Sequence, residues 1–233
     1  MMDNYFLNNP VFLKYKRRFD WKKLRRTPQL VKAIINERIV EIPFALNALS
    51  VIPRDGKVLD VGCMESLFPL FASALGYQVT GFDFREFPYQ APNFTFVQGD
   101  ILDLPFKENE FDAVSCVSTI EHVGIGYYSD PADDVSADVK GIKEIRRILK
   151  PSGLLILSVP FGKAHIDHQQ RVYDTEMINN LLKDFNVTSV QFFKNTRPVL
   201  GNNYWEKVDQ NIAEKIDYQT GTECVCCATA VKH

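Results

Sequence analysis

Three aspartates lie at the carboxyl ends of apolar segments in this sequence, where their side chains could bind a ligand. Asp60 lies in "KVLDV", while Asp83 and Asp100 end "QVTGFD" and "FTFVQGD". A carboxylate accepts hydrogen bonds from hydroxyl and amino groups. Asp83 also follows Gly62 by about 20 positions, the distance at which an acid can reach a ribose diol. A core strand that merely meets a core helix, without a ligand, could carry the same glycine and acid. Gly62 and Asp83 alone therefore do not distinguish a ligand site from a purely structural turn.

The loop after the first of these segments, "VGCMES", indicates which class of ligand fits. Dinucleotide-binding loops carry a second glycine, which lets the backbone approach a pyrophosphate closely, but Met64 places a side chain there. A ligand without phosphates needs no such approach. S-adenosylmethionine is a ligand of this kind, with an adenine, a ribose diol and an amino-acid tail. We therefore predict a site for S-adenosylmethionine rather than a damaged dinucleotide site.

The predicted roles of the acids follow from the parts of that ligand. Asp60 would orient the loop and help to hold the amino group, and Asp83 would accept from the ribose hydroxyls. Asp100, with the backbone of Ile101, would contact the adenine edge. The other candidates lie in the same loops, directly after the strands. The full set of predicted cofactor-binding residues is Asp60, Gly62, Cys63, Met64, Glu65, Asp83, Phe84, Arg85, Asp100, Ile101, Ser118 and Thr119.

Few side chains can take a proton from an acceptor, because the sequence has only four histidines. A positioned base is worth about 10²–10⁴-fold in rate. His122 follows an apolar segment in "STIEHVG", where it is either a base or a residue that contacts the cofactor or shapes the pocket. His165 and His168 lie in a stretch that is either a polar surface loop or part of the acceptor site. With Asp167 they could bind a divalent metal, but we predict none. The candidate catalytic residues are therefore His122, His165 and His168.

Alternating strand-like and helix-like segments predict the framework that positions these residues. We expect helices over 67–75 and 174–183, and another that begins at Asp130-Pro131 and ends before Pro151. Such alternation predicts a parallel sheet with helices on both faces. Ligands bind to such sheets beyond the carboxyl ends of the strands. The expected strands are 57–61, 78–83, 94–100, 111–118, 153–160, 187–193 and 223–231.

Two further segments are predicted to cover the acceptor. Residues 1–56 predict an N-terminal helical extension, with a helix that begins at Thr27-Pro28. Residues 194–222 are too long for a plain loop, and "NNYWEKVDQNIAEKI" within them predicts a helix. Tyr127 and Tyr128 would either stack on an acceptor or pack within their own loop.

The overall composition limits the class of protein. With 45% hydrophobic residues among 233, the chain can bury the core of one α/β domain. The net charge of −2 excludes a chain that binds polyanions over its whole surface. The sequence has neither an apolar run of about 18 residues nor an apolar leader. The cysteines, including Cys224, Cys226 and Cys227, are interpreted as reduced thiols, so we expect a cytoplasmic protein.

Positive charge is concentrated in residues 14–26, "KYKRRFDWKKLRR", which hold eight Lys or Arg against one Asp. The tract is either a solvated face ahead of the core or a patch for an anionic lipid, glycan, nucleotide or RNA. A peripheral contact with a membrane through this tract is compatible with the sequence, whereas a membrane span is not expected.

Several motifs in order give the chain a family resemblance. They are "VLDVGC", "VTGFD", "GDILDLPF", "FDAVSCVSTIEHVG", "EIRRILKPSGLLILSVP" and "RVYD", and they cover about residues 57–195. With them the chain resembles the class I S-adenosylmethionine-dependent methyltransferases. The resemblance implies a Rossmann-like sheet of seven strands, mostly parallel with the last antiparallel. It also implies that residues 57–233 form the methyltransferase domain and that S-adenosylhomocysteine is the product. Met64 and Ser66 depart from the glycines usual in the family.

These observations predict an enzyme that transfers a methyl group from S-adenosylmethionine to a small-molecule or glycan acceptor, at oxygen. One alternative is methylation of RNA, with residues 14–26 as the RNA contact. The aromatic "NPPY"-type signature of base-amino methylation is absent where "STIEH" stands, which disfavours a nucleic-acid acceptor. Another alternative is a catalytically idle cofactor-binding scaffold, against which Asp83 and Asp100 argue. Cofactor binding without turnover on any acceptor would favour the scaffold.

Overall fold

The computed structural model describes residues 36–126, 134–196 and 204–233. The basic tract 14–26, the helix starts predicted at Thr27-Pro28 and Asp130-Pro131, and Tyr127 and Tyr128 lie outside these residues. Among the described residues, no helix combines the length and the apolar character that a membrane crossing requires.

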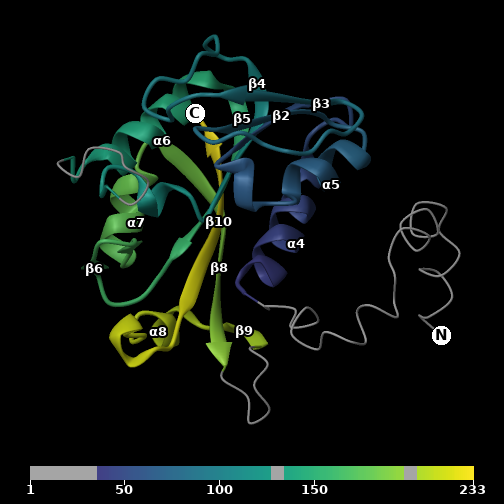
Figure 1. Cartoon of the computed structure of the whole chain (residues 1–233). Coiled ribbons are helices and arrows are strands. Elements are labelled where there is room, and N and C mark those ends of the chain that lie inside the picture. The colour runs from purple at the N-terminus through teal and green to yellow at the C-terminus, as the bar shows by residue number, and fades with distance from the viewer. Residues whose placement is uncertain (1–35, 127–133, 197–203) are drawn as a thin grey trace, which may run out of the picture. The chain divides into compact units, whose positions relative to one another are not determined.

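The described residues form an eight-stranded sheet with the order β3-β2-β1-β4-β5-β10-β8-β9 (Figure 1). The pairs among β1 to β5 are parallel, whereas β10 runs antiparallel to both β5 and β8. The predicted, mostly parallel Rossmann-like sheet with an antiparallel last strand is therefore confirmed. The strands of this sheet are β1 (Lys57–Val61), β2 (Gln78–Asp83), β3 (Phe94–Gln98), β4 (Phe111–Val117), β5 (Leu149–Pro160), β8 (Phe185–Thr196), β9 (Tyr204–Val208) and β10 (Cys224–Lys232).

Strand β9 is the eighth strand of the described sheet, one more than predicted. The helix predicted over "NNYWEKVDQNIAEKI" is wrong for residues 204–208, which pair antiparallel with β8 from Thr196↔Tyr204 to Phe192↔Val208. Only Gln210–Ala213 form a helix, α8. Aromatic and β-branched residues at the start of this stretch favour a strand. Pairing also covers an edge of the long strand β8 that would otherwise expose its backbone groups.

Helices pack on both faces of the sheet, as predicted (Figure 1). One apolar cluster joins one face to α6 and α7 through side chains such as Ile145 and Ile178. A second cluster joins the other face to α4 and α5 through Ala45 and Phe68. The described helical segments are α4 (Arg38–Ala48), η2 (Leu49–Val51), η3 (Cys63–Glu65), α5 (Phe68–Ala74), η4 (Ile120–His122), α6 (Ala137–Ile148), α7 (Thr175–Leu181), α8 and η5 (Tyr218–Thr220).

Helix α4 shares the core of the sheet, although it precedes the predicted domain boundary at residue 56. Ala45 and Leu49 are fully buried in the same cluster as Val58 of β1, and the hydroxyl of Tyr77 donates to the carbonyl of Leu49 (2.7 Å). The division into residues 1–56 and 57–233 stays a prediction. A small hairpin of β6 (His165–Ile166) and β7 (Arg171–Val172) follows β5.

Asp174 caps helix α7, since its Oδ1 accepts a hydrogen bond from the backbone N–H of Met177 (2.9 Å). Asp174→Ala should lower the free energy of unfolding by about 0.5–2 kcal/mol, the usual cost of losing such a cap. Urea denaturation followed by circular dichroism measures this. Asp209→Ala is the matched control, because Asp209 precedes α8 without a side-chain cap bond. Equal losses in the two variants would contradict the capping role.

Candidate functional site

A cavity of about 570 Å³ opens at the carboxyl ends of the parallel strands. In the sheet, β2 and β3 lie on one side of β4, whereas β10, β8 and β9 lie on its other side. The lining of the cavity therefore has two halves. The first half is formed by residues that follow β1, β2 and β3. The second half is formed by α4, the segment before β7, β9, and the stretch around the start of β10. The loop after β4, residues 118–123, lies between the two halves.

Most of the predicted site residues line this cavity, but five do not. Asp60, Cys63, Met64, His165 and His168 are absent from the lining. Their assignment as site residues, and that of the others, stays a prediction. The predicted residues that line the cavity are Gly62, Glu65, Asp83, Phe84, Arg85, Asp100, Ile101, Ser118, Thr119 and His122.

The turn after β1 depends on the single glycine of the loop. Gly62 has a left-handed backbone with φ of 76°. A Cβ at this position would overlap the side chain of Thr119, whose hydroxyl donates to the carbonyl of Val117 (2.9 Å) and lies 3.3 Å from that of Val61. Gly62 therefore serves a close approach between the ends of β1 and β4. The second glycine expected in dinucleotide loops is not needed for this contact.

Asp83 organises the first half of the cavity. Its carboxylate accepts from the backbone N–H of Met64 (3.0 Å), and from the backbone N–H (3.0 Å) and Nε (3.3 Å) of Arg85. Arg85 also pairs with Glu65 across the two loops (2.7 Å). A carboxylate has about four acceptor positions, so Asp83, which is only 4% exposed, retains capacity for a ligand hydroxyl. Met64 contributes through its backbone, which explains why its side chain is tolerated in this loop.

Asp60 lies behind the cavity and not in its wall. Its side chain is 1% exposed, and Oδ2 has no hydrogen-bond partner among the described residues. Burial raises the pKa of Asp60 to about 7, and the nearby carboxylate of Asp83 adds to the effect. Cys63 is fully buried, and burial likewise raises the pKa of its thiol.

Asp100 and Ile101 follow β3 and complete the first half. The Oδ1 atom of Asp100 accepts from the backbone N–H of Leu102 (2.9 Å), which fixes the turn that leads away from the strand. Ile101 packs into the main apolar cluster while it also lines the cavity. The turn therefore offers an exposed carboxylate beside an apolar side chain.

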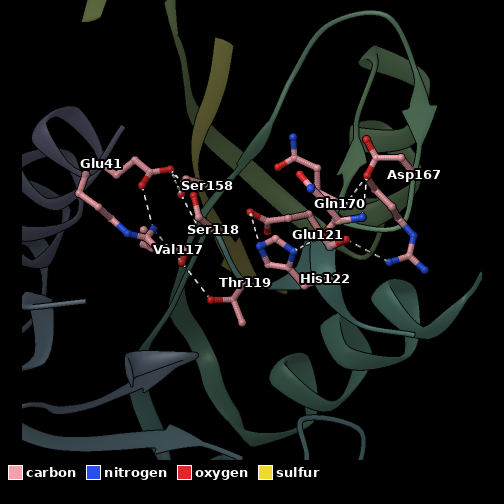
Figure 2. Close-up of polar contacts among 12 residues, drawn as sticks. Glu41, Val117, Ser118, Thr119, Glu121, His122, Ser158, Asp167 and Gln170 are labelled. Atoms are coloured by element: carbon pink, nitrogen blue, oxygen red, sulfur yellow. Dashed lines mark hydrogen bonds and ion pairs between the residues drawn. The ribbon is translucent and has the colours of Figure 1, made fainter. Parts of the chain in front are cut away.

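A buried carboxylate from α4 bonds to side chains at the ends of β4 and β5 (Figure 2). Glu41 is fully buried, and its Oε1 accepts from the hydroxyls of Ser118 (2.6 Å) and Ser158 (2.7 Å). Its Oε2 accepts from Nη1 of Arg38 (2.9 Å), which also donates to the carbonyl of Val117 (3.2 Å). Sequence reasoning missed this cluster, because an acid in an amphipathic helix normally indicates a solvated face.

Glu121 and His122 lie side by side in the loop after β4 (Figure 2). His122 Nδ1 lies 2.6 Å from the carbonyl oxygen of Gln169, and its Nε2 lies 3.8 Å from Oε1 of Glu121. Burial lowers the pKa of His122, although the contact with Gln169 opposes it. Burial raises the pKa of Glu121 to about 8. The guanidinium of Arg171 donates to the carbonyls of Glu121 (3.4 Å) and Val123 (2.5 Å), which holds this loop in place.

The other two candidate histidines lie in or beside the β6–β7 hairpin. His165 Nε2 lies 3.5 Å from Oδ2 of Asp167, whose Oδ1 accepts from the backbone N–H groups of Gln169 and Gln170. This turn therefore supports Gln169, whose carbonyl oxygen contacts His122. Among the described residues, no group of three or more His, Cys, Asp or Glu side chains is arranged to hold a metal ion.

Sequence reasoning also missed much of the second half of the cavity. Glu121 was overlooked beside the more conspicuous His122, although its place directly after β4 was a usable signal. The remaining lining residues come from segments far apart in the sequence, which no local pattern connects. They are Glu37, Arg38, Pro160, Gln169, Gln170, Trp205, Tyr218, Glu223 and Val225.

A family model described as "Methyltransferase domain" matches residues 59–157. The chain is 34% identical over 116 residues to a demethylmenaquinone methyltransferase of Staphylococcus epidermidis, covering 45% of this chain and 43% of that protein. It is 32% identical over 132 residues to an uncharacterized protein of Methanocaldococcus jannaschii, covering 49% of this chain and 52% of that one. The chain thus spans about half the length of the curated relatives it matches.

Solved structures share the fold at low sequence identity. A 1,6-didemethyltoxoflavin-N1-methyltransferase of Burkholderia thailandensis, with S-adenosylhomocysteine bound, gives a TM-score of 0.59 at 18% identity, over 96% of this chain and 90% of that one. A putative methyltransferase of Bacillus halodurans gives a TM-score of 0.55 at 16% identity, over 81% of this chain and 97% of that one. These similarities establish the architecture around the cavity.

Gly62→Ala should destabilise the protein more than Gly76→Ala. Both glycines have positive φ, so both variants carry backbone strain. Only at position 62 does the added methyl group meet Thr119, whereas at position 76 the nearest atom, the carbonyl oxygen of Arg54, is 3.8 Å away. Melting temperatures measured by differential scanning calorimetry provide the comparison. If Gly62→Ala melts at or above the temperature of Gly76→Ala, the close approach is not a constraint.

Asp60→Asn should stabilise the protein at pH 8 relative to wild type, and less so at pH 5. Because the pKa of Asp60 in the folded state is raised to about 7, the folded state holds this proton more tightly than the unfolded chain. The stability that protonated Asp60 contributes is therefore lost as pH rises from about 4 to about 7.

Asp112→Asn serves as the control of opposite sign. Burial of Asp112 acts against its ionised form, but its contacts with Lys150 and Lys57 outweigh this and lower its pKa. Replacing Asp112 by Asn should therefore lower the free energy of unfolding at neutral pH. Thermal melts of both variants at the two pH values test the pair, and parallel changes in both would refute the assignment.

Proposed function

We propose that this chain is a class I S-adenosylmethionine-dependent methyltransferase, in which residues 59–157 match a methyltransferase domain, and that it transfers the methyl group of S-adenosylmethionine to a small-molecule acceptor. The observation that carries the proposal is the cavity at the carboxyl ends of β1 to β4, with Asp83 and Asp100 in its wall. S-adenosylmethionine, when bound, supplies an electrophilic methyl group on a sulfonium.

The first half of the cavity is proposed to hold the cofactor. Asp83 would accept from the ribose hydroxyls, since its carboxylate is fixed by Met64 and Arg85 and retains acceptor capacity. Asp100 and Ile101 would border the adenine. Gly62 would let the chain pass close to the amino-acid tail without a side chain in the way.

The second half of the cavity is proposed to hold the acceptor. The whole cavity, about 570 Å³, has the size of pockets that enclose small molecules. The wall of this half holds three acids, Glu37, Glu121 and Glu223, against the single guanidinium of Arg38, a lining that does not suit the phosphates of a nucleic acid, which supports a small molecule over RNA. The glycan acceptor and transfer to oxygen, expected from the sequence, stay predictions.

The loop after β4 lies where the two ligands would meet. His122 lines the cavity, whereas His165 and His168 do not, so His122 is the histidine that we retain as a candidate proton acceptor. The predicted acceptor cover finds support in α4, because Arg38 of that helix and Glu37 just before it line the second half. A cytoplasmic location and a contact through residues 14–26 remain predictions.

Isothermal titration calorimetry with S-adenosylhomocysteine tests the proposal. Asp83→Asn keeps the size of the side chain but removes its charge, and should weaken binding by about tenfold or more, since bonds to charged groups are worth about 1.5–3 kcal/mol. Asp112→Asn changes an acid of β4 that does not line the cavity, so it should leave the affinity for S-adenosylhomocysteine unchanged. Binding of NAD in place of S-adenosylhomocysteine, or equal affinities in wild type and Asp83→Asn, would count against the assigned ligand.

A further inference from the structure

The ionisable side chains that line the second half of the cavity are mainly carboxylic acids. The carboxyl groups of Glu37, Glu121 and Glu223 face one guanidinium, that of Arg38. Arg38 is already paired with the fully buried Glu41 at 2.9 Å, so its charge is offset. The other Lys or Arg in the described lining, Arg85, lies in the first half and pairs with Asp83 and Glu65. Carboxyl groups therefore outnumber cationic groups in the second half, and a cationic ligand would be favoured there because it stabilises their ionised forms.

Glu121 supplies an independent observation, because it is a buried acid with an unused acceptor. The residue is 1% exposed and lines the cavity, and its Oε2 has no hydrogen-bond partner among the described residues. Folded proteins rarely leave a buried polar atom unpaired. A ligand that brings an N–H group to this oxygen would satisfy it, and a charged N–H donor would form the stronger bond.

Two aromatic residues border the same half of the cavity. Trp205 of β9 and Tyr218 of η5 both line it. The hydroxyl of Tyr218 donates to the carbonyl of Cys224, so its ring is the part left for a ligand. Aromatic faces attract organic cations. Trp205 Nε1 has no partner among the described residues and offers a donor for a second polar atom of the ligand.

We propose that the second half of the cavity binds a protonated amine, and that Glu121 binds its ammonium group and accepts its proton before methyl transfer to nitrogen. This inference rests on the proposed function and differs from the oxygen acceptor predicted from the sequence. Its basis is the excess of carboxyl groups, the unpaired oxygen of Glu121 and the aromatic wall.

The proposed reaction balances with the groups named. The ammonium R–NH3+ gives a proton to the Glu121 carboxylate, which leaves a neutral amine and a protonated acid. The nitrogen lone pair then forms a bond to the methyl carbon as the carbon–sulfur bond breaks. The electron pair of that bond stays on sulfur, so the products are a thioether and a methylated ammonium. Glu121 afterwards returns its proton to solvent.

The titration of Glu121 is consistent with this role. Burial raises its pKa to about 8, so the empty site holds a proton at pH 7, and binding an ammonium displaces about one proton into solvent. The charged and titratable groups that act on Glu121 or lie against it are Glu37, Arg38, Glu41, Cys116, His122, Arg171 and Tyr173.

The test compares matched probes on the full chain saturated with S-adenosylhomocysteine. Tryptamine, tryptophol and indole-3-acetate share one ring and differ in charge, and phenethylamine, 2-phenylethanol and phenylacetate repeat the set with a smaller ring. Calorimetry should show at least one amine binding about tenfold or more tighter than its alcohol and carboxylate. At pH 7, buffers of different ionisation enthalpy should reveal release of about one proton. With S-adenosylmethionine, mass spectrometry should detect methylation of the amine and not of the alcohol.

Variants distinguish a specific role of Glu121 from general effects. Glu121→Gln should abolish the preference for the amine and the proton release, while S-adenosylhomocysteine affinity stays near wild type and shows that the variant is folded. Glu121→Asp should restore part of the preference. Glu110→Gln, outside the cavity lining, should behave as wild type.

The outcomes separate this inference from the proposed function. Failure of wild type to bind S-adenosylhomocysteine overturns the proposed function, and this inference with it. Three results overturn the amine site alone, provided that S-adenosylhomocysteine binds normally. They are the lack of a preference for either amine, a preference that survives Glu121→Gln, and methylation of the alcohol. The absence of binding by all six probes to a protein that binds S-adenosylhomocysteine counts against it in the same way.

Discussion

The buried carboxylate of Glu41 is the interaction on which the second half of the cavity and the boundary between the halves depend. A buried charge is tolerated only when its partners offset the loss of water, and Glu41 has three, Arg38, Ser118 and Ser158. These partners tie α4 to the ends of β4 and β5, the two central strands beneath the cavity. The same contacts fix Arg38 in the wall of the second half and Ser118, with its positive φ of 40°, at the boundary between the halves.

The loop after β4 is held from both sides, which makes it a rigid partition. Thr119 fixes its start through the carbonyls of Val61 and Val117. Arg171, which is itself buried, fixes its end through the carbonyls of Glu121 and Val123. Groups that must lie within a fraction of an ångström of a reacting atom need such support. The "RVYD" motif thus serves the site indirectly, because Arg171 holds the partition and Asp174 caps α7.

The sequence predicts the framework well and the acceptor wall poorly, for a physical reason. Strands such as β1 and β4 carry continuous apolar runs, and the polar ends of parallel strands lie together because they share an edge, so the place of Asp83 in the cavity wall could be predicted before the fold was known. Glu41 could not, since a buried acid looks like a solvated one until its partners are placed. Neighbours in sequence also mislead: His165 and His168 lie near Gln169, but that residue lines the cavity and they do not.

Strand β9 joins the sheet only through β8, at the edge farthest from β2 and β3, yet it places Trp205 in the cavity wall. A peripheral element of this kind can be exchanged, lengthened or lost without disturbing the turns around Gly62 and Asp83. Changes at this edge of the sheet can therefore alter one half of the cavity, while the half in which we propose that the cofactor binds stays unchanged.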